Sequence, residues 1–193
     1  MKMILSTLLT ATLLIGITQL AEGQCWKSRQ KTGYFDANIG LGLLPTYAKD
    51  GGHPAGLPIS ASLNYRIQEN FSLGAFAGYS FTQGRRVFTG SLTAAPWQNR
   101  TTVAGLRFAA HSNPVGDWEF YGGMAGGLHL SRFDIMEAEA REKALRHGFH
   151  ARQSKCYATG FLGARYCLRK NLGLFSEVGM GDSLLKMGMS LRF

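Results

Sequence analysis

Apolar side chains occupy every second position in eight segments of this chain, and this periodicity constrains the fold more than any other feature. The last segment shows it most clearly, since Leu185, Met187, Met189, Leu191 and Phe193 alternate with Lys186, Gly188, Ser190 and Arg192. The other seven segments lie at residues 35–43, 57–68, 71–81, 102–111, 118–130, 161–167 and 172–180. Because successive side chains of a β-strand point to opposite faces, each segment is predicted to be a strand with one apolar face.

The lengths of these segments and of their connections predict how the strands are arranged. Most of the segments have 9–12 residues, enough for a tilted strand to cross a bilayer. Connections at 69–70, 112–117 and 169–171 are short, those at 45–56, 82–101 and 131–155 are long, and the last outer connection, at 181–182, is short. This asymmetry predicts an all-β fold, an eight-stranded antiparallel up-and-down transmembrane β-barrel with short periplasmic turns and long outer loops.

Aromatic side chains gather at one end of the predicted strands. Those that share the apolar parity and the same end are Phe35, Tyr65, Phe71, Phe108, Trp118, Tyr166 and Phe193. Aromatic rings favour the membrane interface, so this set predicts a girdle at the periplasmic side. The alternative is a soluble eight-stranded barrel that holds a ligand, as in lipocalins, which requires apolar residues inside and polar residues outside. The girdle and the terminal aromatic residue favour the membrane barrel.

The N-terminal segment has the pattern of an export signal. Lys2 precedes an uncharged apolar run at 3–20, and Ala21-Glu22-Gly23 provides small residues at the two positions that signal peptidase reads. We therefore expect a cleaved signal peptide at 1–23, a periplasmic arm at 24–32 and the barrel at 33–193. A single membrane-spanning anchor is the competing interpretation of the apolar run.

Three runs of sequence and the final residue resemble a known family. The runs are Asp117-Trp118-Glu119-Phe120-Tyr121-Gly122-Gly123 followed by Gly126-Gly127, then Gly163-Ala164-Arg165-Tyr166, and Leu174-Phe175-Ser176-Glu177-Val178-Gly179. Together with the eight segments, they resemble the small outer-membrane β-barrel family of the OmpA and OmpX type. The resemblance implies residence in the outer membrane of a Gram-negative bacterium and recognition of the strand ending at Phe193 by the barrel-assembly machinery. Since members of this family share no catalytic centre, we expect an envelope-structural or surface-interaction protein and not an enzyme.

Charged residues recur at the polar parity, which faces the lumen of the predicted barrel. They are Asp36, Arg66, Arg107, Glu119, Arg165, Glu177, Lys186 and Arg192, with His111 and His129 at the same parity. Side chains fill the narrow interior of an eight-stranded barrel, and charges buried there need partners. We predict a salt-bridge network that seals the lumen. The alternative is a narrow channel for small solutes.

A second set of cations borders the outer ends of the strands. The predicted phosphate contacts are Arg85, Arg86, Arg132 and Arg152. The set also includes Arg100 and Lys155, and cations at this depth can pair with phosphates of outer-leaflet lipid and lipopolysaccharide. The net charge of +9 suits anionic lipid head groups, whereas an exported chain is not expected to meet nucleic acid.

The third long outer loop carries a helical pattern. Asp134 is a candidate N-cap with Glu137 three residues on, and the pattern predicts a short helix that ends near His147, before Gly148. Because binding residues are often carried by loops on a rigid scaffold, the outer loops are the expected site of any surface ligand.

Motifs for catalysis are sparse. His129-Leu130-Ser131, with Glu139 or Glu142 downstream, resembles the His, Ser and Glu set of lipid A deacylases, so a hydrolase of that kind is a second alternative function. No metal-ligand spacing such as CxxC occurs in the sequence, and neither a metal nor a cofactor is expected.

The three cysteines are an odd number for an exported chain. Cys156 and Cys167 are predicted to lie roughly 35 Å apart at opposite ends of one strand, too far for a disulfide. A bridge between Cys25 and Cys167 near the periplasmic rim remains open.

Overall fold

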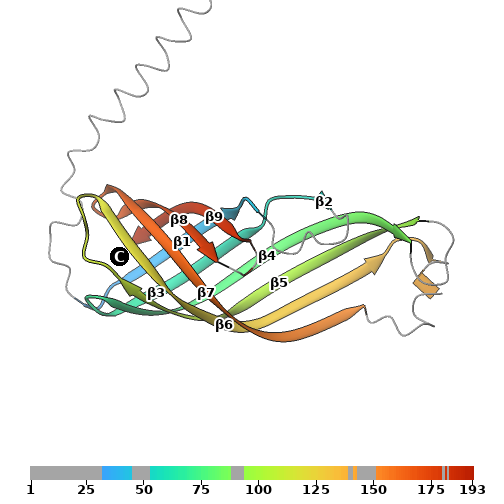
Figure 1. Ribbon diagram of the computed structural model, residues 1–193, viewed down its shortest axis with the longest axis horizontal. Helices are drawn as coiled ribbons and strands as arrows, with labels where there is room; N and C mark the ends of the chain where they lie inside the picture. Colours follow the sequence, from blue (N-terminus) through green and yellow to red (C-terminus); the bar gives the residue numbers. More distant parts are fainter. Residues whose placement is uncertain are drawn as a thin grey trace, which may run out of the picture.

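The computed structural model describes residues 32–44, 53–87, 94–138, 141–142, 151–179, 181 and 183–193. Its strands are β1 (Phe35–Gly42), β2 (His53–Pro54), β3 (Ile59–Gln68), β4 (Phe71–Val87), β5 (Ala94–His111), β6 (Trp118–Ile135), β7 (Arg152–Arg169), β8 (Leu172–Gly179) and β9 (Leu185–Arg192). All except β2 form one antiparallel barrel, in which each strand pairs with the next and β9 pairs with β1 (Figure 1). The predicted eight-stranded up-and-down barrel is therefore confirmed. The predicted signal peptide and residues 24–31 of the arm lie outside the described residues.

The last residue closes the barrel against the first strand. Phe35 donates its N–H to the carbonyl oxygen of Phe193 at 2.8 Å, and Phe193 donates to Phe35 at 3.0 Å. Their rings stack with centroids 6.0 Å apart. The two strands also approach closely at Gly188, where a Cβ atom would lie 2.1 Å from the carbonyl oxygen of Ile39. The chain terminus is thus part of the seam that completes the barrel wall.

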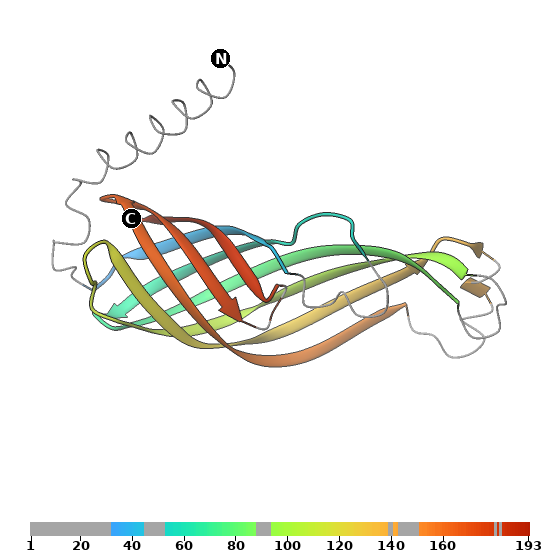
Figure 2. The ribbon, with the colours of Figure 1, turned by 45° about the horizontal axis from the view of Figure 1, so that its top comes forward.

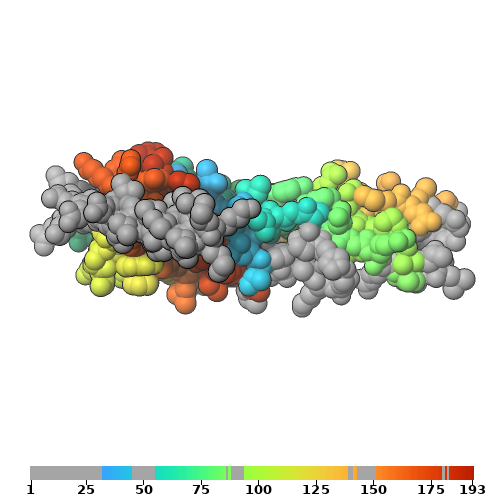
Figure 3. Space-filling view, turned by 90° about the horizontal axis from the view of Figure 1, so that it is seen from above, coloured from blue at the N-terminus to red at the C-terminus, as the bar shows by residue number. Residues whose placement is uncertain are grey.

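The wall has two heights. Strands β1, β8 and β9 have 8 residues each and β3 has 10, whereas β4 has 17 and β5, β6 and β7 have 18 each. The four long strands continue well past the ends of the others at one end of the barrel (Figure 2). In the space-filling view the C-terminal strands (red) lie in one part of the elongated molecule, and green and light orange segments from the middle of the chain extend into the other part (Figure 3). We call the protruding part of β4–β7, beyond the ends of β8 and β3, the outer extension.

Two of the predicted long loops are therefore wrong. Most of residues 82–101 belong to β4 and β5, and both ends of residues 131–155 belong to β6 and β7. The reason is that the alternation reverses its polarity along these strands. In the barrel the outward residues are apolar, such as Leu106 and Leu128, whereas in the extension Arg100 points outward and Trp97 and Ile135 are buried on the inner face. The apolar alternation on the outward side therefore stops where this reversal begins, although the strands themselves continue.

The predicted aromatic girdle is present at the end of the barrel opposite the extension. Phe35 packs against Tyr65 with ring centroids 5.0 Å apart, and Trp118 packs against Tyr166 at 5.0 Å. Phe71 stacks on Phe108 at 5.6 Å. Neighbouring strands thus share aromatic contacts on the outer surface, as expected for rings at a membrane interface.

The helix predicted from Asp134 is not shown. Asp134 and Ile135 are the last residues of β6, so Asp134 as a helix N-cap is wrong. One backbone bond of helical spacing follows, from Arg141 N–H to Glu137 O at 2.9 Å. Residues 139–140 and 143–150 lie outside the described part of the chain. Within that part, no helix is long and apolar enough to cross a membrane.

Candidate functional site

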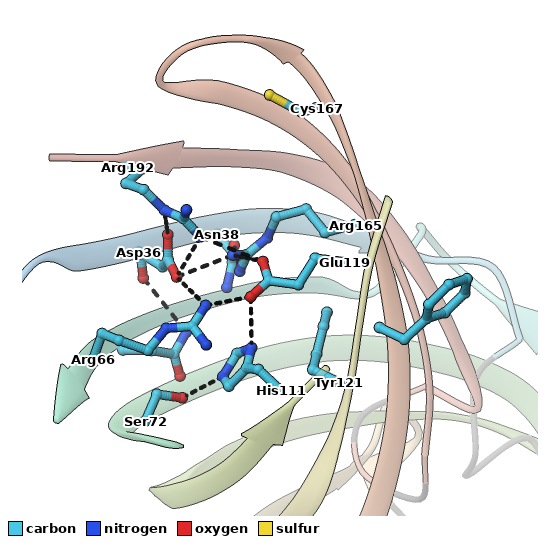
Figure 4. A network of polar contacts seen from close by, with 12 residues as sticks. Asp36, Asn38, Arg66, Ser72, His111, Glu119, Tyr121, Arg165, Cys167 and Arg192 are labelled. Carbon is cyan, nitrogen blue, oxygen red and sulfur yellow. Dashed lines mark hydrogen bonds and ion pairs between the residues drawn. The ribbon is translucent and has the colours of Figure 1, made fainter. Parts of the chain in front are cut away.

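Two carboxylates and three guanidinium groups meet inside the barrel near the aromatic girdle (Figure 4). Asp36 accepts hydrogen bonds from Arg165 Nη1 at 3.0 Å and from Arg192 Nε at 2.7 Å. Glu119 accepts from the same two arginines at 3.2 and 3.3 Å. Arg66 donates to Glu119 and lies 3.8 Å from Asp36. Each arginine therefore touches both carboxylates, and we call these five residues the Asp36–Glu119 cluster.

Three further side chains, His111, Ser72 and Tyr34, complete this cluster. His111 lies between Ser72, whose Oγ is 2.8 Å from its Nε2, and Glu119, 3.1 Å from its Nδ1. The Tyr34 ring covers Arg192 and Arg66, with guanidinium carbons 4.4 and 5.4 Å from its centroid. Ser72 and Tyr34 were not among the sequence-predicted site residues. Its position among the polar residues of β4 predicts that Ser72 faces the lumen, but nothing in the sequence indicates that its hydroxyl group contacts His111.

A second ion-pair group lies farther along the lumen. Arg107 Nη2 donates to Glu177 Oε2 at 2.7 Å, and Lys186 Nζ is 3.8 Å from Glu177 Oε1. The Arg107 guanidinium also lies over the Phe161 ring, 4.0 Å from its centroid. Tyr121 donates its hydroxyl to Glu177 at 3.4 Å. Charged and aromatic side chains thus share the middle of the lumen.

Little free space remains between these layers. Two cavities border Phe76, Arg107, Glu177 and Lys186, with volumes of about 20 and 10 Å³. Each has room for about one water molecule. The structure therefore places all eight predicted lumen charges in two clusters.

The predicted phosphate contacts lie on the outer extension. Arg85, Arg132 and Arg152 are exposed at the outward parity, and the side chain of Arg86 lies outside the described residues. Arg132 is directly opposite Arg152, whereas Arg85 lies farther out, opposite Pro96. Arg132 is also opposite Arg100, which the predicted phosphate set omits.

Two of the residues proposed for a hydrolase, His129 and Ser131, lie on β6. His129 and Ser131 share the inward parity of Tyr121 instead of facing lipid. Ser131 Oγ donates to Asn99 Oδ1 at 2.8 Å, so its described partner is an amide oxygen and not a general base. Glu139 lies outside the described residues. Among the described residues, no group of three or more His, Cys, Asp or Glu side chains could hold a metal ion.

The cysteines are placed as follows. Cys156 is exposed and has a free thiol, which agrees with the prediction that it does not pair with Cys167. Cys167 is buried at the girdle end of β7. Cys25 lies outside the described residues, so a bridge between Cys25 and Cys167 stays a prediction.

Comparison by sequence gives no match to a protein family or to a curated protein. Solved structures do match. The outer membrane protein OprG from Pseudomonas aeruginosa has a TM-score of 0.52 and 14% identity, over 85% of this chain and 97% of OprG. The chain has the fold of the small outer-membrane β-barrels. The predicted resemblance is thus confirmed at the level of the fold.

Two other small barrels match over similar shares of the two chains. The N-terminal β-barrel domain of Pseudomonas aeruginosa OprF has a TM-score of 0.47 and 12% identity, over 84% of this chain and 98% of that domain. Ail, the attachment invasion locus protein of Yersinia pestis, has a TM-score of 0.45 and 13% identity, over 85% of this chain and 100% of Ail. At such identities the likeness concerns the fold alone.

Proposed function

We propose that the protein is an integral barrel of the Gram-negative outer membrane that does not conduct solutes and does not catalyse a reaction. Its role is structural support of the envelope and interaction at the cell surface. The observation that carries this proposal is the Asp36–Glu119 cluster. Together with His111 and Ser72, its members come from β1, β3, β4, β5, β6, β7 and β9, which is every barrel strand except β8. The cluster therefore reaches across the lumen from almost every side of the wall.

The energetics of buried charge support a permanent seal. All five cluster residues are at most 7% exposed. Removing one partner of a buried ion pair typically costs about 3–5 kcal/mol, because the remaining charge stays desolvated. A passage through this layer would separate several such pairs at once. The sealed state is consequently favoured over a narrow channel.

The outer extension supports a role at the cell surface. Its outer face carries exposed charged side chains such as Arg100 and Arg132, and the far part of its inner face buries Ala95, Trp97 and Ile135, as on a sheet that stands in water. Rigid strands thereby hold the connections between β4 and β5 and between β6 and β7 away from the membrane. Because recognition residues are often found on loops that a rigid scaffold positions, these connections are the proposed contact region.

Conductance of the purified protein in planar bilayers tests the proposal. The wild-type protein should insert and give no stable single-channel steps. An R66A/R165A double variant removes two of the three guanidiniums and should show conductance events if the cluster is the seal. The shift in gel mobility on heating, which reports a folded barrel, controls for misfolding of the variant. Stable uniform steps from the wild-type protein would establish the channel instead.

The absence of catalysis has its own test. The acyl chains of glycolipid incubated with the pure protein should remain intact by mass spectrometry. Release of fatty acid that an S131A variant abolishes would assign the protein to the hydrolases.

A further inference from the structure

Three arginines form one row across the outer face of the extension. Arg100 on β5 is directly opposite Arg132 on β6, and Arg132 is directly opposite Arg152 on β7. All three side chains are exposed at the outward parity. Residues directly opposite in an antiparallel pair have Cβ atoms about 5 Å apart, so the three side chains start within about 10 Å of one another. We call Arg100, Arg132 and Arg152 the arginine row.

The row lies immediately beyond the apolar surface of the barrel. The preceding row on the same face contains Leu130, which is 46% exposed, and Tyr79 on β4. Phe81 occupies the β4 position of the arginine row itself, and the Arg100 guanidinium lies 6.0 Å from its ring centroid. Aromatic side chains concentrate where hydrocarbon meets head groups. The arginine row is therefore at the depth of the head groups of the outer leaflet.

The row also has excess positive charge. Like charges directly opposite on a sheet destabilise it, unless an anion is shared between them. Among the described residues, one carboxylate contacts the row: Asp134 Oδ2 lies 3.5 Å from Arg132 Nε. Three guanidiniums facing one carboxylate leave two positive charges for an external partner.

We propose that the arginine row binds phosphate groups on the glycolipid of the outer leaflet. A sugar-linked phosphate carries between one and two negative charges at neutral pH, which matches the uncompensated charge of the row. A guanidinium group presents parallel N–H donors that fit two phosphate oxygens, and a row of three can hold more than one phosphate. This inference deepens the proposed function, and it rests on the proposed location in the outer membrane. It assigns Arg100 to the site and separates Arg85, which lies farther out, from it.

Reconstitution into vesicles of defined composition tests this assignment. One sample contains zwitterionic phospholipid alone. Three others contain the same phospholipid mixed with phosphorylated glycolipid, with enzymatically dephosphorylated glycolipid, or with phosphatidylglycerol. A fifth sample contains zwitterionic phospholipid with inorganic phosphate in the buffer. The midpoint of thermal unfolding should rise by several degrees with phosphorylated glycolipid only. The R100Q/R132Q/R152Q variant should lose that rise, and its apparent affinity for the glycolipid should fall about tenfold or more.

Matched variants separate the row from general loss of charge. R85Q removes an exposed arginine of the same extension, and R169Q removes an exposed arginine at the girdle end. Both should keep most of the glycolipid-dependent rise. An equal rise with phosphatidylglycerol or inorganic phosphate, or an equal loss in R169Q, would overturn the assignment to glycolipid phosphate.

The outcome also distinguishes the two proposals. A protein that fails to reach the heat-modifiable folded form in any vesicle contradicts the outer-membrane location. A protein that folds and inserts, but unfolds at the same temperature with and without glycolipid phosphate, overturns the arginine row alone.

Discussion

Replacing Glu119 by Gln should weaken the barrel more than any other single loss of one charge in the lumen. Glu119 contacts Arg66, Arg165 and Arg192, and it also lies beside His111. In the wild type, two carboxylates face three guanidiniums. The substitution leaves Asp36 alone against all three, and the new amide NH₂ group donates where only acceptors fit.

The expected magnitude follows from the contact distances. At an effective dielectric constant of about 20, each contact at 3.2–3.3 Å between Glu119 and an arginine has a Coulomb energy of about 5 kcal/mol. Most of this attraction offsets the cost of burying the charges. Loss of one partner from a buried pair has a net cost of about 3–5 kcal/mol. We expect the free energy of unfolding of Glu119→Gln to fall by that amount.

Urea unfolding in phospholipid vesicles measures this free energy, with tryptophan fluorescence and gel mobility as two probes. Glu177→Gln is the internal comparison, because the ion-pair partners of Glu177 among the described residues are two cations, Arg107 and Lys186, and its loss should cost less. Glu69→Gln, on the exposed turn after β3, should change the stability by less than about 0.5 kcal/mol.

A double-mutant cycle decides whether the cluster itself is responsible. The R66M/E119Q double variant restores the net charge of the wild-type cluster, so its loss should be smaller than the sum of the two single losses. Additive losses, or a Glu119→Gln loss no greater than that of Glu69→Gln, would refute the reasoning.

Three further predictions concern the wall. Deletion of Phe193 removes both hydrogen bonds that it exchanges with β1, and the yield of heat-modifiable barrel in native membranes should drop at least several-fold, with Phe193→Tyr as the control that keeps the ring. Gly188→Ala should likewise prevent closure, because its Cβ atom would lie 2.1 Å from a carbonyl oxygen of β1, whereas Gly56→Ala meets no atom within 4 Å and should fold normally. Brominated lipid should quench the fluorescence of Trp118, which is 47% exposed on the girdle, and leave Trp97, buried in the extension, unaffected; equal quenching of both would contradict the reversed polarity of the extension.

The sequence was sufficient to predict the eight strands and their closure. Apolar and polar residues alternate along a strand such as β9, and this alternation determines which side chains face lipid and which face the lumen. A closed barrel then leaves no unpaired strand edge in lipid. The outer extension was missed because its outward residues are polar. The criterion that identified Leu106 as lipid-facing rejected Arg100 on the same strand, although both alternate in the same register.

The candidate sites were predictable only in part. Parity showed that Asp36 and Glu119 face inward, but it does not show which arginines they contact, since this depends on the stagger of strands far apart in the chain. Irregularities in the pairing, such as the one between Arg66 and Gln68, shift that stagger without a clear signal in the sequence. For the same reason the alignment of Arg100 with Arg132 requires the register of the folded sheet.

The tall and short parts of the wall also differ in how early their contacts can form during folding. Over their protruding halves, the described residues of β4–β7 pair as successive neighbours in the chain, apart from the two-residue strand β2, which pairs with β4. The seam between β1 and β9 instead joins Ala37 to Leu191, from opposite ends of the barrel sequence. Contacts between distant segments require the closure of a long loop, which makes them slow to form. The extension can therefore assemble as a series of local hairpins while the seam is still open, and Phe193 takes part in the last step of closure.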